Sequence, residues 1–203
     1  MNLIEFTEFL MKSVQYLAST LIEVIKLINP ANIDGVFKNL KPGSPGMLRA
    51  YLMTISILLF LGYFLFLFRF QTNPYSLDNS LKVAFRYYAI AVLLPMSMSY
   101  MLYLFDTRLL KRKVTYSEAL TLFTYALSPA ILSGVFRTIP ETWVLHLLII
   151  MYSIYLVYAG MSARFGEEHI TMPFIFLILA GVITSMIIYE ILTVALMIPG
   201  GYY

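Results

Sequence analysis

Glu190 is the residue best suited to chemistry inside a membrane, because it is an acidic side chain within an apolar stretch of isoleucine, leucine and tyrosine. An ionisable side chain at mid-membrane costs about 2.5–3.5 kcal/mol on insertion scales, so such a residue usually faces a bundle interior and has a partner there. Arg86 and His146 are expected in the same half of the membrane. We therefore hypothesise that Glu190 pairs with Arg86 or His146, or stays protonated among tyrosine hydroxyls.

Two roles are open for this acid. Glu190 could have a structural role and stabilise the packing of one helix against another. It could instead belong to a proton- or ion-coupled pathway, where intramembrane ionisable residues are typical. A change of Glu190 to glutamine separates the two roles, because only a pathway would lose transport while the fold stays intact.

Enzymatic chemistry has little support in the sequence. The chain has no cysteine and only two histidines, His146 and His169. It contains no phosphate-binding glycine loop, dinucleotide fingerprint or zinc-type His/Glu pair. His169 follows Glu167 and Glu168, which is typical of a solvated loop. The sequence therefore predicts a non-enzymatic protein with no metal site and no cofactor.

Prolines and small residues mark positions where helices bend or approach closely. Pro95 and Pro129 each free a backbone carbonyl within the membrane, which neighbouring helices or serine and threonine side chains can satisfy. Ala126, Ala130 and Gly134 recur every four residues and predict a groove for close helix packing. The groove could serve contacts within the bundle or a homodimer.

Tyrosines recur every three residues at Tyr152, Tyr155 and Tyr158. Tyr155 is expected near mid-membrane, where its hydroxyl needs a hydrogen-bond partner from another helix. This favours an inward-facing Tyr155, either packed in the core or lining a cavity.

The elements that position these residues follow from composition. The 203 residues are 60% hydrophobic and 12% charged, which is more apolar than a soluble domain. The sequence therefore predicts an all-α integral membrane protein with five transmembrane helices. Five stretches are long enough to cross about 30 Å of hydrocarbon, namely 48–68, 83–105, 119–136, 143–163 and 173–197.

Residues 1–28 predict an N-terminal amphipathic helix on the cytoplasmic membrane surface. Polar residues recur there every three or four positions and apolar residues fill the rest of the helix. The alternative is that this helix packs against the bundle as a lid. Pro30 ends the helix, and residues 42–46 form a linker rich in proline and glycine. We divide the chain into a cytoplasmic region, 1–46, and a membrane domain, 47–203.

Orientation follows from the positive charges. With a cytoplasmic N-terminus, ten of the 14 lysine and arginine residues lie inside, and many of these lie between residues 106 and 113. The sequence predicts a multi-pass protein of the cell membrane with its C-terminus outside, or of the endoplasmic reticulum or Golgi in a eukaryote. The net charge of +3 is small, and no nucleic-acid partner is expected.

An ordered set of residues runs through the third and fourth predicted spans. It comprises Tyr125-Ala126-Leu127-Ser128-Pro129, Gly134, Ile139-Pro140, Tyr152, Tyr155 and Gly160. Their order and spacing resemble the Yip domain, the Ypt/Rab-interacting membrane protein family. Pro30 and Phe37 are similar to the proline and phenylalanine that precede the first span in prokaryotic members. The resemblance covers roughly residues 28–198.

The resemblance implies a cytoplasmic N-terminus, five membrane helices and almost no C-terminal tail. Eukaryotic members of the family act in vesicle traffic and associate with small GTPases and with one another. Their acidic Asp-Leu-Tyr-Gly-Pro stretch has no counterpart in residues 29–37. We therefore expect a bacterial or archaeal member, and the resemblance does not imply its molecular role.

The predicted function is to organise or shape the membrane, or to recruit a protein partner at the cytoplasmic face. The lipid bilayer and a second copy of the chain are further expected partners. The alternative is a channel, carrier or lipid transporter that uses Glu190 and Arg86. A transporter is expected to have a continuous polar cavity reaching Glu190, Arg86 or Pro129, whereas a scaffold is expected to be packed shut.

Overall fold

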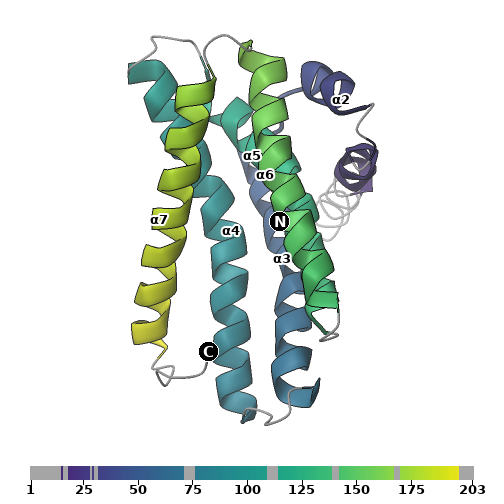
Figure 1. The fold of residues 1–203 in the computed structure, drawn as a ribbon, viewed down its shortest axis with the longest axis vertical. Coiled ribbons are helices and arrows are strands. Elements are labelled where there is room, and N and C mark those ends of the chain that lie inside the picture. The colour runs from purple at the N-terminus through teal and green to yellow at the C-terminus, as the bar shows by residue number, and fades with distance from the viewer. Residues whose placement is uncertain are drawn as a thin grey trace, which may run out of the picture.

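The protein is helical throughout the part described by the computed structural model, in which no strand occurs (Figure 1). The structure describes residue 15 and residues 18–27, 29, 32–70, 76–108, 114–138, 142–166 and 170–196. The predicted all-α fold class is confirmed for these residues. Most of the predicted interfacial helix, together with Pro30, Pro140 and the residues after 196, lies outside them.

The helices follow one another along the chain in a simple order. They are α2 (Ile33–Asn39), α3 (Pro45–Leu65), α4 (Leu77–Arg108), α5 (Tyr116–Leu132), α6 (Trp143–Phe165) and α7 (Thr171–Ala195). A π-helical turn, η2 (Phe66–Phe70), extends α3, and a 3₁₀ helix, η3 (Ser133–Thr138), extends α5. Residues 18–26 are also helical where they are described. In Figure 1, α7 forms one edge of the bundle, and α2 with the N-terminal helix lies at the other.

Four helices are long and apolar enough to cross a membrane. They are α3 with most of η2 (Pro45–Arg69), α4, α6 and α7. These four coincide with four of the predicted spans. The predicted span at 119–136 corresponds to α5 and η3. Because α5 has only 17 residues, it is not among the four, and the five-span count stays a prediction.

The start of α5 is fixed by a capping box. Thr115 is the N-cap residue, and its hydroxyl accepts a hydrogen bond of 3.3 Å from the Glu118 backbone N–H. In return, Glu118 Oε2 accepts a hydrogen bond of 2.9 Å from the Thr115 backbone N–H. Each side chain thus satisfies a backbone donor that has no partner within the helix.

α3 begins at Pro45, within the stretch 42–46 that the sequence predicted to be a linker. Proline is tolerated at the first helical position because its missing N–H would have no partner there. The Leu48 N–H donates to the Ser44 carbonyl at 3.0 Å, which closes the first turn. The linker prediction is therefore wrong for Pro45 and Gly46.

The core lies around α5, which packs against α3, α4 and α6. Most residues of α5 are buried, whereas the other long helices each keep a broad apolar face exposed. The largest fully buried side chains include Phe123, Leu120 and Leu122 from α5 and Tyr51 from α3. A helix surrounded by other helices can carry apolar residues on every side, as α5 does.

The small residues of α5 and η3 allow close approach to two different neighbours. A Cβ atom at Gly134 would lie 2.0 Å from Leu59 Cδ1 of α3 and 3.0 Å from Leu59 Cα. Ala130, one turn earlier, donates its backbone N–H to Ser153 Oγ of α6 at 3.1 Å. This bond lies directly after Pro129, where the proline interrupts the regular hydrogen bonding of α5.

α7 is the least enclosed of the candidate spans. It packs chiefly against α4, and only 11% of its most apolar stretch is buried. The contact is close at Gly181, where a Cβ atom would lie 3.1 Å from Met98 Sδ. The exposed residues of α7 are mainly isoleucine, leucine, valine and methionine, as expected for a helix that borders lipid.

Replacing Gly134 with alanine is expected to lower the free energy of unfolding by about 1–3 kcal/mol, because overpacking forces the α3 backbone at Leu59 to shift. Unfolding by SDS titration in detergent micelles measures the change. Gly35→Ala is the matched control, since nothing lies within 4 Å of a Cβ atom there. Gly35→Ala should leave the free energy of unfolding unchanged or raise it by up to about 1 kcal/mol. Equal effects of the two substitutions would contradict the close contact.

Candidate functional site

The N-terminal segment, by which we mean the described residues 18–27, 29 and 32–44, is docked on α5 and α6. Phe37 of α2 is 1% exposed, and its ring lies so close to Gly160 of α6 that a Cβ atom there would be 2.9 Å from Phe37 Cε1. The Tyr152 hydroxyl of α6 donates to the Leu27 carbonyl. Val24 and Leu27 are buried in the same core. The described part of the N-terminal helix thus packs against the bundle, which matches the lid alternative.

Arg164, near the end of α6, joins the N-terminal segment to α5. Its Nη1 donates to the Leu40 carbonyl at 2.8 Å, and its Nη2 donates to Glu118 Oε1 at 3.0 Å. Both side chains are mostly buried, at 17% and 27% exposed. Arg164 therefore fixes the positions of the N-terminal segment, α5 and α6 relative to one another.

Gly43 makes the second connection between the N-terminal segment and α5. Its N–H donates to Thr121 Oγ1 at 3.0 Å, and its carbonyl accepts a hydrogen bond of 2.5 Å from Ser117 Oγ. Because Ser117 and Thr121 are one turn apart on α5, both backbone polar groups of Gly43 are held by one helix.

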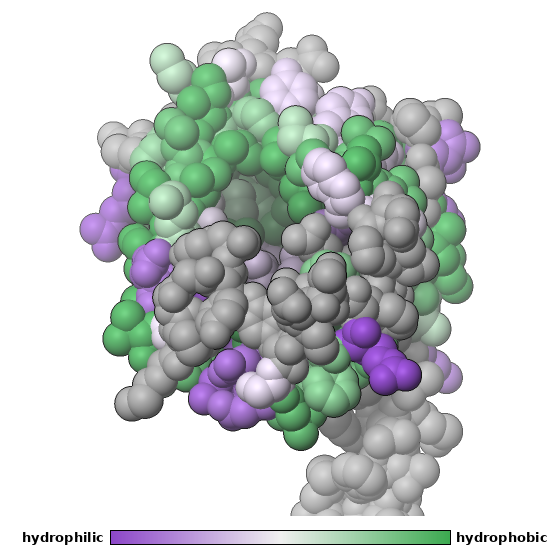
Figure 2. All heavy atoms as spheres, turned by 60° about the horizontal axis from the view of Figure 1, so that its bottom comes forward, coloured by the Kyte–Doolittle hydropathy of each residue, from purple (hydrophilic) through white to green (hydrophobic). Residues whose placement is uncertain are grey.

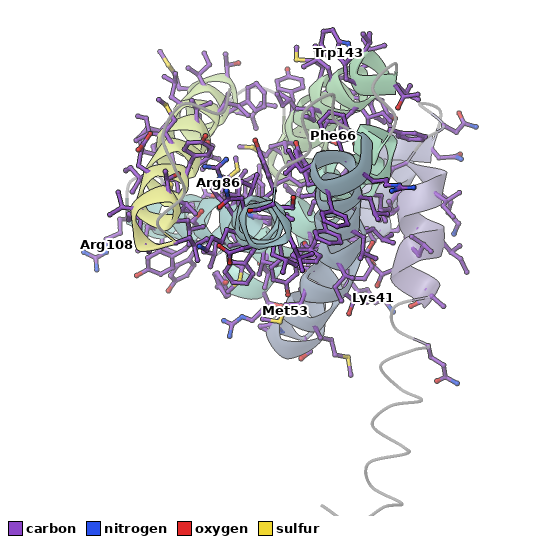
Figure 3. All side chains as sticks on the ribbon, turned by 90° about the horizontal axis from the view of Figure 1, so that it is seen from below. Lys41, Met53, Phe66, Arg86, Arg108 and Trp143 are labelled. Atoms are coloured by element: carbon purple, nitrogen blue, oxygen red, sulfur yellow. The ribbon has the colours of Figure 1, made fainter. Side chains whose placement is uncertain are left out.

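Arg86 lies buried between α4 and α7, at 5% exposed. Its Nη1 donates to Thr193 Oγ1 at 2.9 Å, and its guanidinium carbon lies 3.9 Å from the centre of the Tyr189 ring. The Tyr87 ring is 5.4 Å away. Figure 3 shows Arg86 on α4, beside α7. The two ring contacts of Arg86 are cation–π interactions of roughly 0.5–2 kcal/mol. They offset only part of the cost of placing a charge at membrane depth.

Glu190 does not pair with Arg86 or His146 in the structure, so the predicted pairing is wrong. Glu190 is exposed on α7, whereas Tyr189 and Thr193 face Arg86. Adjacent residues of a helix point about 100° apart, so the face that carries Tyr189 turns Glu190 away from α4. Among the described residues, the ion pairs are Lys26–Glu23, Lys82–Asp78 and Arg164–Glu118.

His146 has a different partner from the one predicted. It is 9% exposed, and its Nδ1 lies 2.7 Å from Ser133 Oγ at the start of η3. This hydrogen bond joins α6 to η3. His146 is therefore a link between neighbouring helices.

Tyr155 faces outward, and its predicted inward position is wrong. It is 50% exposed, whereas Ser153 and Leu156 of the same helix are buried. Ser153 and Tyr155 are two residues apart, which places them on nearly opposite sides of α6. The buried face of α6 carries mainly small and aliphatic residues, such as Ser153, Leu156 and Gly160.

A cavity of about 360 Å³ lies among α3, α4, α5, α6 and α7. In the space-filling view of Figure 2, a hollow with apolar walls opens at the end of the bundle where α4 begins. Its walls are mostly apolar, and three of their polar side chains are engaged. Ser153 accepts from Ala130, Ser185 donates to the Val182 carbonyl at 2.7 Å, and His146 Nδ1 lies 2.7 Å from Ser133 Oγ. The cavity is therefore suited to an apolar occupant of small-ligand size.

The cavity meets neither of the two expectations from the sequence. Its walls include Pro95 but not Glu190, Arg86 or Pro129, so it is not a polar route through those residues. The bundle is not packed shut either. Within the described part of the chain, no three histidine and acidic residues come together as metal ligands.

One known family matches the sequence of this chain. The Yip1 domain pattern matches residues 25–189, which is most of the chain. The chain belongs to the Yip1 family. No curated protein and no solved structure matches it. The resemblance predicted from the sequence is thus confirmed, and the Yip1 match includes α2 as well as the long helices.

Several residues that carry the Yip1 resemblance meet at the docked N-terminal segment. Phe37 contacts Gly160, and Tyr152 binds the Leu27 carbonyl. Tyr125 and Pro129 are buried in α5. Phe37, Gly160 and Tyr152 therefore lie where α6 contacts the N-terminal segment, whereas Arg86 lies between α4 and α7.

Sequence reasoning missed the partners of Arg86 and the Glu118–Arg164 ion pair. One signal was available for Arg86, because Tyr189 and Thr193 are spaced by four residues and lie in the same predicted membrane half. No comparable signal linked Glu118 to Arg164, which are 46 positions apart. The cavity also had no signal in the sequence.

Stability is expected to depend on pH through Glu118. Hydrogen bonding from the Thr115 backbone and then from Arg164 holds the pKa of the Glu118 carboxyl below 4.5, and outweighs burial, which acts in the opposite direction. Because the folded-state pKa is lowered, the stabilisation is present above the unfolded pKa and is lost as pH falls through the folded value. The free energy of unfolding should fall by roughly 1 kcal/mol on acidification through that window.

Thermal unfolding of the detergent-solubilised protein from neutral pH to about pH 3 measures this dependence. Glu118→Gln should lower stability at neutral pH and flatten the profile. Glu23→Gln is the matched control, since Glu23 pairs only with Lys26 three residues away on the surface. If Glu118→Gln has the same pH dependence of stability as the wild type, the Glu118 carboxylate does not contribute to that dependence.

Proposed function

We propose that this Yip1 family member is a non-enzymatic, multi-pass protein that organises the membrane around it or recruits a partner at the cytoplasmic face. The observation that supports this most is the chemistry of its interior. The cavity has mostly apolar walls, Ser153, Ser185 and His146 on those walls are engaged in hydrogen bonds, and the walls do not include Glu190. Ion and proton pathways are typically lined by polar or ionisable groups.

We also propose that α5 with η3 is the fifth span. Ser117 of α5 bonds to Gly43 just before α3, and Gly134 of η3 contacts Leu59. Leu59 lies 14 residues after the start of α3, or about 21 Å along its axis. α5 and η3 therefore run parallel to α3 over most of its length. Five crossings place the two ends of the chain on opposite sides, with the N-terminus cytoplasmic.

The described end of the N-terminal helix has two unlike faces that suit a surface role. Val24 and Leu27 are buried against the bundle, whereas Ile22 and Ile25 are each 55% exposed. The exposed isoleucines are available to the headgroup region or to a protein partner while the helix remains docked. A role as both lid and interfacial helix fits this arrangement.

Lipid transport is the second candidate, and one observation favours it. The cavity contacts α6 and α7, the two spans that expose the most apolar residues. A lipid chain could therefore enter from the side. An assay of lipid scrambling in vesicles separates a transporter from a protein that only holds lipid.

Proteoliposomes that carry a potassium or proton gradient are expected to leak at the rate of protein-free vesicles, because the cavity offers no polar route. Ion-sensitive dyes inside the vesicles measure the rate. Glu190→Gln should behave like the wild type, as should Glu23→Gln as a control for the loss of one carboxylate. Rapid flux that disappears in Glu190→Gln would overturn the proposal in favour of an ion-coupled pathway.

Single cysteines test the fifth span cleanly, since the chain has none of its own. Arg108→Cys and Trp143→Cys flank α5, and both positions are exposed. If α5 crosses the membrane, an impermeant thiol reagent applied to intact cells should label only one of the two. Ser44→Cys and Ser76→Cys flank α3 and serve as controls for a crossing helix. Labelling of positions 108 and 143 from the same side would contradict five spans.

A further inference from the structure

Arg86 carries a positive charge for which the described residues provide no carboxylate. It makes one hydrogen bond, from Nη1 to Thr193, and its Nε has no hydrogen-bond partner among the described residues. The acidic residue nearest in sequence to its contacts, Glu190, is exposed on another face of α7. The guanidinium group is therefore held in place by Tyr189 and Thr193, and none of the described residues neutralises its charge.

The predicted span places Arg86 near the depth of a lipid headgroup. α4 has 32 residues and is about 48 Å long, which exceeds the hydrocarbon core of about 30 Å. Arg86 lies nine residues from the start of α4 at Leu77, or about 14 Å along the helix. The predicted apolar span begins at residue 83, so Arg86 lies about one turn inside it. This is the boundary between headgroups and acyl chains.

The apolar cavity starts beside Arg86 and runs away from it toward the centre of the bundle. Along α4, its walls are formed by Tyr87, Ile90, Leu94 and Met98 in succession. These residues span about 16 Å of helix. Along α7, Ser185 lies one turn from Tyr189, and Ile178 lies farther inside. A cation at one end and an apolar channel below it match the two parts of a phospholipid.

We propose that Arg86 and this cavity together bind one anionic phospholipid, with its phosphate at the Arg86 guanidinium group and one acyl chain in the cavity. Arginine is well suited to phosphate because its planar N–H groups match the phosphate oxygens. The lipid enters between α6 and α7, which are joined at one end and separate toward the other in Figure 1. This site goes beyond the proposed function and does not depend on it, since a scaffold or a transporter could hold such a lipid.

A partner helix is a poorer occupant of this space than a lipid chain. A cavity of about 360 Å³ enclosed by five helical elements suits a single chain of small-ligand size. A docked helix would also leave Arg86 without an anion. A free phosphate would satisfy Arg86 but would leave the apolar walls empty. The phospholipid satisfies both the charge and the cavity.

The test uses the full chain in nanodiscs that contain equal amounts of dioleoyl phosphatidylglycerol and dioleoyl phosphatidylcholine. Native mass spectrometry after release from the nanodisc counts the lipids that remain bound. We expect the wild type to retain phosphatidylglycerol in preference to phosphatidylcholine. Arg86→Gln should reduce that preference about tenfold, which is the effect of one charge-assisted contact. Arg86→Lys, which keeps the charge and loses the planar fork, should be intermediate.

Matched variants separate the site from general effects of charge and bulk. Lys82→Gln removes a cation one turn away that pairs with Asp78, and it should retain the preference of the wild type. Val182→Trp should exclude the acyl chain, because Val182 lines the cavity. Ile183→Trp adds the same bulk at a residue that is 57% exposed and is not on the cavity wall, so lipid retention should be unchanged.

Two outcomes would overturn the proposal. One is a phosphatidylglycerol preference in Arg86→Gln equal to that of the wild type. The other is unchanged lipid retention in Val182→Trp. Because Val182 is half-exposed, this variant tests the cavity even if Arg86→Gln fails to fold. Glycerol 3-phosphate carries the phosphate without the chains and should not compete at comparable concentration. Effective competition by it would assign the site to a soluble anion. Ion flux does not enter these outcomes, so they stand apart from the test of the proposed function.

Discussion

The lack of hydrogen-bond partners in the hydrocarbon core of a bilayer is the constraint on which this structure depends. A backbone group left unpaired there costs several kcal/mol, so the spans must be helical and polar side chains must find partners between helices. Several of the described serines follow this rule. Serines bond back to their own helices at Ser99 and Ser128, and Ser153 bonds across to the backbone that follows Pro129.

Hydrogen bonds to its backbone carbonyls hold the N-terminal segment at the end of the bundle. The segment crosses the end of the bundle between its own helix and α3, and its carbonyls at Leu27, Leu40 and Gly43 each accept a hydrogen bond from α5 or α6. Phe37 fills the space that Gly160 leaves open. Family positions concentrate at this junction, whereas the cavity and Arg86 lie where α7 has few neighbours. The side formed by the N-terminal segment, α5 and α6 is thus closely packed, whereas the side formed by α4 and α7 is more open.

Residue pattern alone indicated most of the fold. Runs of apolar residues located α3, α4, α6 and α7 to within a few residues, because span length is set by the thickness of the membrane. The small residue Gly134 was recognised as a site of close approach, although its neighbour, Leu59, was not. The start of α3 at Pro45 was missed because proline both ends one helix and can begin the next.

The sequence by itself determined that the chain is a helical membrane protein and that it carries few charges that its membrane spans must accommodate. Hydrophobic length and composition are local properties, and each span can be recognised without its neighbours. Only the tertiary structure decided which charges and hydroxyls meet, because partners such as Arg86 and Thr193 are 107 residues apart. Rotation of α7 about its axis turns Tyr189 toward Arg86 and Glu190 away, and that rotation is set by packing against α4, which residue order alone does not encode.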